Sequence, residues 1–393
     1  MQNKTLYISY NGLLEPLGQS QIIPYIEILS KFTKISIISI ENQNSLFYKS
    51  KQNLRSILKK KKIQWKFFNR NNFSTFKNIF IISKIIFTSI FLMYKKKINI
   101  VHARSFIPGL IGFVLKKINP KIKLIYDIRG FWIDEKIDRT KFTKNYFYNF
   151  LIFLDKCIYK NSDRIICLTN HSRLILIKKY NFIKKSNIFI IPTCGDHNNF
   201  FPVKNLNNKQ IQFCYVGSVG GAYDFYKVVS FILEIYKNTN ENIFFSIINT
   251  SQHNKIKSIM DKINFPRNLY KISESNREDI SSFINSSDIG CFYANENFSI
   301  KASFPTRIAE FLLSGKPILC NSFNDDVIDM IDNNNIGIIS DFKLNYEPNY
   351  YTKIINYIKK SRDNRQEIRK FAIDNLSLKY AENKLSLIYG SIN

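Results

Sequence analysis

The sequence predicts an α/β protein with two domains, each built on a parallel sheet that helices cover on both faces. The chain has 393 residues, more than one hydrophobic core usually supports. It is 45% hydrophobic and 15% aromatic, which supplies enough apolar side chains for two cores. Short apolar runs alternate with segments of helical period, and the polar stretch Pro192–Asn208 interrupts this alternation. We therefore place the linker between the domains in that stretch.

The first domain is expected over residues 1–200. Ser20–Phe32 illustrates its helices, because Ile22, Ile26 and Leu29 recur at helical spacing. Strands are expected at Leu6–Tyr10, Ile35–Ile40, Ile63–Phe68, Ile100–Ala103, Leu124–Asp127, Arg164–Leu168 and Ile188–Pro192. Further helices are expected at Lys49–Lys61, Asn78–Lys95, Pro108–Lys117, Phe142–Lys160 and Asn170–Tyr180.

The second domain, over residues 201–375, repeats this alternation without a detectable sequence repeat. Strands are expected at Gln212–Val216, Ile243–Ile248, Leu269–Ile272, Asp288–Tyr293 and Pro317–Cys320. Helices are expected at Tyr223–Tyr236, Ser251–Lys262, Ile280–Ser286, Pro305–Leu313, Asp325–Asn333, Tyr350–Ser361 and Asn364–Ile388. Residues 376–393, at the end of the last helix, are a candidate to pack back on the first domain.

The apolar stretch Phe76–Tyr94 is nearly long enough to span a bilayer. Lys77 and Lys84 interrupt it, and it falls where the alternation requires a helix. We favour a core helix of the first domain. A helix on the membrane surface and a membrane span are the alternatives.

The net charge of +28 is concentrated in the first half of the chain. Residues 1–200 hold 35 Lys and Arg against 10 Asp and Glu, whereas residues 201–393 hold 23 against 20. No acidic residue occurs between Glu41 and Asp127. This asymmetry favours an anionic partner for the first domain. No recognisable RNA- or DNA-binding module is present, so a nucleic acid is not the expected partner.

The cysteines and the N-terminus favour a cytoplasmic protein. The six cysteines form no CxxC pair, and several lie in apolar runs, as Cys167 does. Reduced core residues are therefore expected rather than a disulfide or metal set. Met1–Tyr10 resembles a short buried strand and not a secretory signal.

Two glycine-bearing loops follow predicted strands. Gly18 lies in the first, Tyr10–Ile26, and Gly217 and Ser218 begin the second, Gly217–Gly221. Ligands of open α/β sheets bind at the carboxyl ends of strands, where glycine lets backbone amides approach a phosphate. Neither loop has the GxGxxG or P-loop pattern. Ordinary glycine turns are the alternative for both.

A third stretch, Ser303–Asn321, is predicted to begin a helix at Pro305. Thr306 and Arg307 in its first turn offer N–H groups and a cation to a diphosphate. Glu310 lies one turn further, where a carboxylate accepts hydrogen bonds from ribose hydroxyls. An ordinary helix–strand unit with solvated charges is the alternative.

Together these stretches resemble glycosyltransferase family 4 of the GT-B enzymes, and its bacterial cell-surface polysaccharide branch in particular. The matching stretches follow one another over almost the whole chain. They are YNGLLEPLGQSQ (10–21), YDIRGFWIDE (126–135), YVGSVG (215–220) and SFPTRIAEFLLSGKPI (303–318).

The resemblance implies two Rossmann-like domains whose parallel sheets face a central cleft, with the acceptor on the first domain and the nucleotide on the second. It implies transfer of a sugar from a nucleotide-sugar donor to a saccharide or lipid-linked acceptor, typically with retention at the anomeric carbon. Neither a bound metal nor a cofactor is expected. The product would be a cell-surface polysaccharide such as O-antigen, capsule or exopolysaccharide. The donor-binding residues would be Gly18, Gly217, Ser218, Thr306, Arg307 and Glu310.

The sequence departs from the family pattern near the expected donor site. Many members have two Glu residues separated by seven residues, and here Ala302 stands at the first position and Glu310 at the second. Tyr223–Asp224 lies where many members have Arg and Lys, so Arg307 and Lys316 are the candidates to neutralise the diphosphate. The missing Glu leaves open a non-catalytic sugar- or nucleotide-binding protein of the same fold.

The catalytic residues are expected at neighbouring strand ends in the first domain. The His that many family members carry there is not evident. Asp127 and Arg129 follow one strand, and His102 and Arg104 lie on its neighbour. We assign Asp127, with Arg129 beside it, as a base or positioning group. A simple ion pair between the two is the alternative.

The basic first half is expected to bring the acceptor site to an anionic membrane, as a peripheral protein on the inner face of the plasma membrane. Lys59–Lys62 would contact head groups, and hydrophobic residues of Trp65–Phe68 and Phe73–Phe80 would enter the interface. Solvated charge enriched by codon bias is the alternative.

Overall fold

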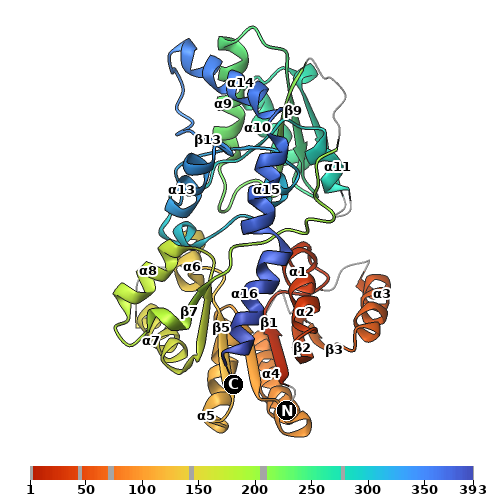
Figure 1. The fold of residues 1–393 in the computed structure, drawn as a ribbon, viewed down its shortest axis with the longest axis vertical. Coiled ribbons are helices and arrows are strands. Elements are labelled where there is room, and N and C mark those ends of the chain that lie inside the picture. Colours follow the sequence, from red (N-terminus) through yellow and green to blue (C-terminus); the bar gives the residue numbers. More distant parts are fainter. Residues whose placement is uncertain are drawn as a thin grey trace. The chain divides into compact units, whose positions relative to one another are not determined.

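The computed structural model describes residues 3–42, 47–69, 75–140, 146–203, 210–275 and 279–392. The chain forms two compact units, whose elements are labelled in Figure 1. Unit 1 comprises Met1–Pro192 together with Ala381–Asn393, and unit 2 comprises Thr193–Tyr380. Each contains a sheet of parallel strands with flanking helices, so the predicted α/β class is confirmed. The acceptor and donor roles of the two predicted domains stay predictions.

The sheet of unit 1 has seven strands in the order β3-β2-β1-β4-β5-β6-β7. The chain moves outward in one direction from β1 and in the other from β4, so the carboxyl ends of these two strands flank the switch point at which open α/β sheets bind ligands. The strands are β1 (Lys4–Ser9), β2 (Lys34–Glu41), β3 (Gln64–Asn69), β4 (Ile100–Arg104), β5 (Lys123–Asp127), β6 (Arg164–Cys167) and β7 (Ile188–Ile190).

Three helices of unit 1 form one layer. Because crossovers between parallel strands are right-handed, the connections β3 to β4, β4 to β5 and β5 to β6 lie on the same face of the sheet. They carry α4, α5 and α7, and α5 packs against both of the others. The helices are α1 (Pro16–Gln21), α2 (Ile23–Leu29), α3 (Phe47–Lys60), α4 (Thr75–Lys96), α5 (Phe106–Ile118), α6 (Trp132–Thr140), α7 (Tyr146–Asn161), α8 (Asn170–Lys179), η1 (Lys185–Asn187) and, at the C-terminus, α16 (Leu378–Gly390).

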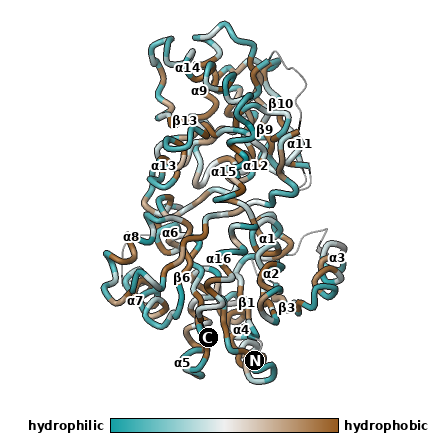
Figure 2. The backbone as a smooth tube through the Cα atoms, viewed as in Figure 1, coloured by the Kyte–Doolittle hydropathy of each residue, from teal (hydrophilic) through white to brown (hydrophobic). Residues whose placement is uncertain are grey.

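The core of unit 1 lies between this helix layer and the sheet. Val101 and Leu124 of the strands meet Ile111 of α5, and all three are fully buried. Most residues of β1 and β6 are buried, so these strands are covered on both faces; Figure 2 shows the hydropathy of their residues. Burial on both faces is typical of parallel sheets and accounts for the continuous apolar runs in the sequence.

The sheet of unit 2 has six strands in the order β10-β9-β8-β11-β12-β13. They are β8 (Ile211–Val216), β9 (Ile243–Ile248), β10 (Tyr270–Ser273), β11 (Ile289–Cys291), β12 (Ile318–Cys320) and β13 (Gly337–Ile339). The helices are α9 (Phe225–Asn238), α10 (His253–Lys262), η2 (Arg267–Leu269), α11 (Ile280–Asn285), η3 (Phe298–Ala302), α12 (Thr306–Leu313), α13 (Asp325–Asn334), α14 (Pro348–Ser361) and α15 (Arg365–Leu376). Every predicted strand is present, whereas β13 was missed because three residues are too short for a periodic pattern.

Two predicted helices are each divided in two. The helix predicted over Ser20–Phe32 is α1 followed by α2, and Ile22 separates them with φ −110°. The helix predicted over Asn364–Ile388 is α15 followed by α16, with Ser377 extended between them at φ −87° and ψ 160°. Ser377 pairs there with Gly195, so a tertiary contact and not a local signal ends α15. Helix α6, which follows the turn at Arg129–Gly130, was not predicted.

The prediction that Phe76–Tyr94 is a core helix is confirmed for one face of the helix and is wrong for the opposite face. The described residues of α4 pack one face on the sheet through Ile85, Ser89 and Met93, all of them buried. Phe87, on the opposite face, is 72% exposed. By length and composition Asn78–Lys96 would suffice to cross a membrane, although its buried face belongs to the core of unit 1.

Candidate functional site

Unit 2 presents a glycine loop at the carboxyl end of β8. Gly217, Gly220 and Gly221 have φ values of +124°, +95° and +68°, which side chains rarely adopt. The loop leads to α9, whose N-cap Asp224 accepts a hydrogen bond from the Lys227 amide. Glycine is therefore required by the backbone here, beyond the need for a turn.

The turn between β9 and α10 holds this loop in place. Asn249 donates its Nδ2 to the Gly217 carbonyl at 2.8 Å. The Gln252 side chain accepts from the Val219 amide at 2.7 Å and donates to the Val219 carbonyl at 3.0 Å. From β8 itself, the Tyr215 hydroxyl donates to the Ser218 carbonyl at 2.6 Å. These bonds organise the loop before any ligand arrives.

Arg307 in the first turn of α12 points at the glycine loop. Its Nη2 lies only 2.6 Å from the position that a Cβ on Gly217 would occupy. The guanidinium lies over the ring of Tyr223 at 4.1 Å and near those of Tyr215 and Phe292 at 5.1 and 5.4 Å. The side chain is buried, and its Nη1 has no hydrogen-bond partner among the residues that the structure describes. A buried donor without a partner is costly, so this atom is available to an anion at the loop.

The electrostatics keep Arg307 charged. Burial opposes its charge, but the nearby Tyr215 and Tyr223 outweigh burial and raise the pKa of the guanidinium. Glu310, one turn along α12, is buried and acts in the same direction. A desolvated cation of this kind interacts more strongly with phosphate than an exposed one.

The other predicted donor-binding residues of unit 2 lie around the same loop or helix. Ser218 is exposed in the loop, and Thr306 begins α12 directly after Pro305. Ala302 is buried at the end of η3, where the family pattern has its first Glu. The structure thus assembles Gly217, Ser218, Thr306, Arg307 and Glu310 in one region of unit 2, and their role in donor binding stays a prediction.

Lys255 is a cation that the sequence analysis missed. It lies on α10, and its Nζ is 3.3 Å from the Val219 carbonyl and 2.7 Å from a Cβ placed on Gly220. The usable signal was its place just after β9, because the carboxyl ends of neighbouring parallel strands share one edge of the sheet. Lys227, also near the loop, bonds to the Tyr293 hydroxyl at 2.7 Å, and this contact raises its pKa.

The prediction that Lys316 neutralises a diphosphate is wrong. Its Nζ donates to the Ser287 carbonyl at 2.5 Å, and its side chain is 1% exposed. Both residues directly precede strands, so they lie at the amino edge of the sheet, opposite the glycine loop. Burial lowers the pKa of Lys316 to about 7, with the charge of Arg365 as a second cause. Lys316 therefore lies near the structural ion pairs that Arg362 and Arg365 form with Asp288.

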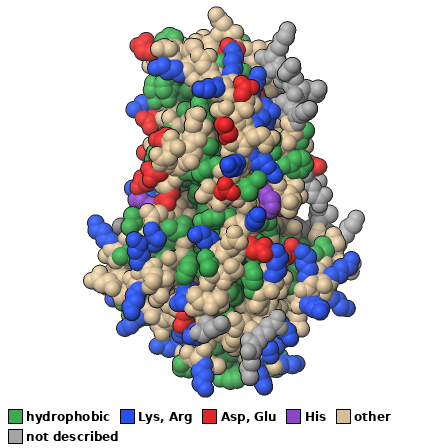
Figure 3. Space-filling model, in the orientation of Figure 1, with side chains coloured by type: hydrophobic (Ala, Val, Ile, Leu, Met, Phe, Trp, Pro, Cys, Tyr) green, Lys and Arg blue, Asp and Glu red, His purple; other side chains and the backbone are tan. Residues whose placement is uncertain are grey.

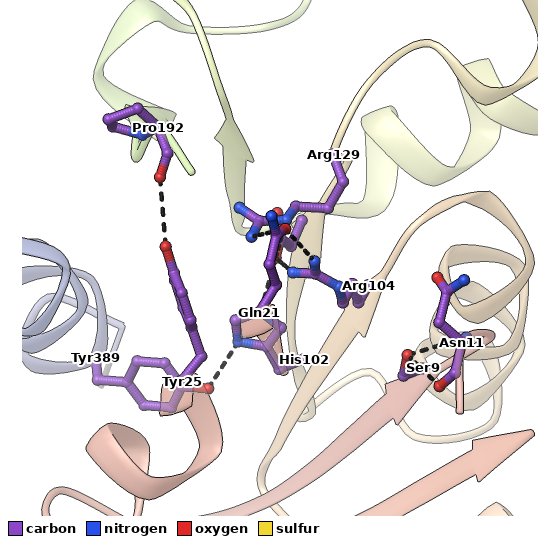
Figure 4. A network of polar contacts seen from close by, with 10 residues as sticks. Ser9, Asn11, Gln21, Tyr25, His102, Arg104, Arg129, Pro192 and Tyr389 are labelled. Atoms are coloured by element: carbon purple, nitrogen blue, oxygen red, sulfur yellow. Dashed lines mark hydrogen bonds and ion pairs between the residues drawn. The ribbon is translucent and has the colours of Figure 1, made fainter. Parts of the chain in front are cut away.

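In unit 1, a buried polar cluster lies at the ends of β4 and β5 (Figure 4). Arg104 and Asp127 are register partners in the sheet, and Arg104 donates its Nη1 to Asp127 Oδ2 at 3.4 Å. Arg129 Nε lies 3.7 Å from the same oxygen. The Gln21 side-chain oxygen accepts from both arginines, at 3.1 and 3.3 Å. The ion pair between Asp127 and Arg129, left open as the alternative, is thus present.

His102 connects this cluster to the C-terminal helix. Its Nδ1 lies 2.9 Å from the Tyr389 hydroxyl of α16, and its Nε2 is 3.7 Å from Asp127 Oδ2. Its ring stacks on Tyr7 with centroids 4.6 Å apart. Burial lowers the pKa of His102 in spite of the nearby Asp127. His102 is therefore neutral at pH 7.

Asp127 is held ionised. Burial alone would raise its pKa, but Arg129, the nearby His102 ring and Arg104 together lower it. A carboxylate with a lowered pKa is a weak proton acceptor, because general bases work best with a pKa near the operating pH. Of the two roles assigned to Asp127, the geometry favours the positioning group.

Arg129 is the most constrained residue of the cluster. It adopts a left-handed φ of 52°, which is uncommon for a residue other than glycine. Its guanidinium lies 5.3 Å from the ring centre of Tyr25, and within the described ranges its Nε and Nη1 have no hydrogen-bond partner. Gln21, Tyr25 and Tyr389 were not expected here, since each comes from a segment that is distant in the sequence from Asp127.

Gly18 lies in unit 1, in helix α1, and is buried. A Cβ there would be 2.0 Å from the Gly12 carbonyl, so close packing requires glycine. The amides of Leu13 and Leu14 in the same loop donate to the Glu41 carboxylate at 2.7 and 3.2 Å. The donor-binding role of Gly18 stays a prediction. Within the described ranges, no group of three or more His, Cys, Asp or Glu is arranged to hold a metal ion.

The comparisons with known proteins agree with this architecture. Residues 196–374 match the family model described as glycosyl transferases group 1. Comparison with curated protein sequences gives no match.

Several solved structures share the fold over the full chain. A glycosyltransferase from Rickettsia africae aligns with a TM-score of 0.72 at 17% identity, covering 100% of this chain and 99% of that one. Anabaena HepE in complex with UDP and glucose aligns with a TM-score of 0.69 at 10% identity, covering 99% and 100%. The lipopolysaccharide outer core galactosyltransferase WaaB aligns with a TM-score of 0.61 at 11% identity, covering 98% and 99%. Residues 196–374, which lie in unit 2, thus match the model of glycosyl transferases group 1, in a chain that shares its fold with solved GT-B glycosyltransferases.

Proposed function

We propose that the protein is a glycosyltransferase that moves a sugar from a nucleotide-sugar donor to a saccharide or lipid-linked acceptor, and that unit 2 binds the donor. The observation that carries the proposal is the buried Arg307, whose unpartnered Nη1 and neighbouring Nη2 lie against the glycine loop. The match of residues 196–374 to glycosyl transferases group 1 supports it. Structural relatives in complex with UDP and UDP-glucose support a nucleotide-sugar donor.

The diphosphate is the leaving group, and negative charge grows on it as the bond to the sugar breaks. Arg307 lies against Gly217 and Lys255 against Gly220, so both supply positive charge at the glycine loop. Preorganised charges of this kind stabilise a transition state without reorganising as it forms. We assign this stabilisation to the two side chains, with no metal ion. Glu310 would accept hydrogen bonds from the ribose hydroxyls.

Unit 1 would bind the acceptor. In this assignment Asp127, held between Arg104 and Arg129, orients the cluster while the acceptor hydroxyl attacks the anomeric carbon. We further propose retention at that carbon and a role in cell-surface polysaccharide synthesis, for which the likeness to the lipopolysaccharide enzyme WaaB is the support. The enzyme would work in the cytoplasm, on the inner face of the plasma membrane. Its basic first half supports an anionic surface as partner, and Figure 3 shows that Lys and Arg outnumber Asp and Glu on the visible face of unit 1.

The test is a turnover assay with a panel of UDP-, GDP- and ADP-sugars, preceded by a thermal-shift screen, since a bound donor raises the melting temperature. Release of the nucleoside diphosphate should depend on Lys255. The variant Lys255→Ala is therefore compared with Lys257→Ala, an exposed lysine on the same helix. A donor that binds without turnover under any acceptor condition would indicate a non-catalytic binding protein. Equal turnover by both variants would remove Lys255 from the site.

A further inference from the structure

The outward face of α4 is aromatic and exposed. Ile79, Phe80, Phe87, Phe91 and Tyr94 are between 56% and 72% exposed. Residues 80, 87, 91 and 94 follow the spacing of one helical face, opposite the buried face that packs on the sheet. Single exposed apolar residues are ordinary, but a continuous stripe over four turns of one helix is not.

The outward face of α7 repeats this feature. Tyr146, Phe147, Phe150 and Phe153 are between 53% and 94% exposed. The buried residues of the same helix include Ile158 and Tyr159 on its other side. We call the exposed stripes of α4 and α7 together the aromatic face.

The two stripes point to the same side of unit 1. Helices α4 and α7 lie in one layer with α5 between them (Figure 1), and each turns its buried residues toward the sheet. Their outward faces therefore share one direction, away from the sheet. The aromatic face therefore lies on one side of unit 1, with α5 between its two stripes.

Among the described residues, the charged side chains on the outward faces of α4 and α7 are positive. Lys84 Nζ lies 4.4 Å from the ring centre of Phe80, and Lys95 Nζ lies 5.1 Å from that of Phe91. Helix α4 contains no acidic residue, and the one acid of α7, Asp155, accepts a hydrogen bond from the buried Tyr126 at 3.1 Å. Lysines whose stems lie along aromatic rings can extend their ammonium groups from an apolar layer to an anionic one.

We infer that the aromatic face inserts into the head-group region of an anionic lipid bilayer, with α4 and α7 lying parallel to the membrane. Aromatic residues with lysines beside them suit the boundary between acyl chains and anionic head groups. A membrane span is disfavoured because Ile85 and Met93 of α4 belong to the core of unit 1. A symmetric dimer through this face would set lysine against lysine, since the same patch faces itself.

This inference rests on the anionic-membrane part of the proposed function and deepens it. The sequence analysis placed the contact at Lys59–Lys62, with hydrophobic residues of Trp65–Phe68 and Phe73–Phe80 entering the interface, whereas the structure extends the hydrophobic part along α4 to Tyr94 and adds α7. An inserted aromatic face adds a hydrophobic contribution that salt does not screen. Vesicle binding also needs no sugar donor, so failure here is distinguishable from failure of the proposed transferase activity.

The experiment is flotation with vesicles of phosphatidylcholine alone and of phosphatidylcholine with phosphatidylglycerol. The test variant carries Phe87→Ser and Phe91→Ser, and the matched control carries Tyr226→Ser and Tyr236→Ser on α9 of unit 2, which are 43% and 37% exposed in the native protein. We expect the native protein and the control to bind anionic vesicles and to retain part of that binding in 1 M NaCl. The test variant should bind at least ten-fold more weakly while keeping its circular dichroism spectrum. A separate Phe87→Trp variant should show a blue-shifted emission on anionic vesicles.

Two results would overturn the inference. The first is unchanged vesicle binding by the test variant. This includes the case in which a separate variant with Lys59–Lys62 changed to Gln loses binding and the test variant does not. The second is a native dimer that does not bind vesicles and that Phe87→Ser with Phe91→Ser converts to a monomer, since the face would then bind a second copy of the chain.

Discussion

Replacing Arg307 by Met tests the donor site most directly. Methionine preserves much of the contact with the rings of Tyr215, Tyr223 and Phe292 but removes the charge and the unpartnered Nη1. A lost hydrogen bond to a charged group costs about 1–3 kcal/mol, so affinity for a nucleoside diphosphate should fall by roughly 5- to 150-fold. Affinity for the uncharged nucleoside should change little, because Arg307 is assigned to the diphosphate.

The assay is isothermal titration of the diphosphate and the nucleoside selected by the thermal-shift panel. Arg267→Ala is the matched control, since Arg267 also belongs to unit 2 and its side chain is 87% exposed. A melting temperature near that of the native protein shows that the variant folds. If Arg307→Met binds the diphosphate as the native protein does, the assignment of α12 to the donor is refuted.

Three further predictions concern unit 2. Glu310→Ala should weaken both the diphosphate and the nucleoside in the same titrations, and a loss confined to the diphosphate would contradict its ribose role. Gly217→Ala should lower the free energy of unfolding in urea by about 1–3 kcal/mol, since alanine is strained at φ +124° and its Cβ meets Arg307; an unchanged midpoint would contradict this. The folded-state pKa of Lys316 is about 7, below its unfolded value, so the unfolded chain binds more protons between these values and stability rises with pH. Between pH 7 and 9 the free energy of unfolding of the native protein should therefore rise, relative to that of Lys316→Met, by up to about 1.4 kcal/mol per pH unit. Urea unfolding that gives the two proteins the same dependence on pH would exclude this.

The sequence alone predicted the order of strands and helices well, because a strand buried on both faces must be apolar throughout. It failed where the deciding contact lies elsewhere. The division between α15 and α16 depends on the pairing of Ser377 with Gly195. The extent of α4 was predicted, but its exposed face was not. The sequence of an apolar helix does not show whether one or both of its faces are covered by other elements.

In the candidate site, too, some features could be predicted from local pattern and others depend on contacts between distant segments. The glycine loop could be predicted from local pattern, because positive φ values favour glycine. Arg307 could be predicted because a few residues around Pro305 are enough to recognise the start of a helix. Lys255 and the environment of Lys316 do not, since a lysine beside a glycine loop and a lysine at the opposite edge of the sheet are identical in sequence.

What the sequence by itself determined is the α/β class, the parallel strands and the concentration of positive charge in the first half of the chain. These depend on residue type and spacing, which are local properties. Only the tertiary structure decided that Gln21, His102, Asp127 and Tyr389 meet in one buried cluster, and that the aromatic residues of α4 and α7 remain uncovered. Such meetings depend on which strands become neighbours and which helix faces find a partner, and no short stretch of sequence records either.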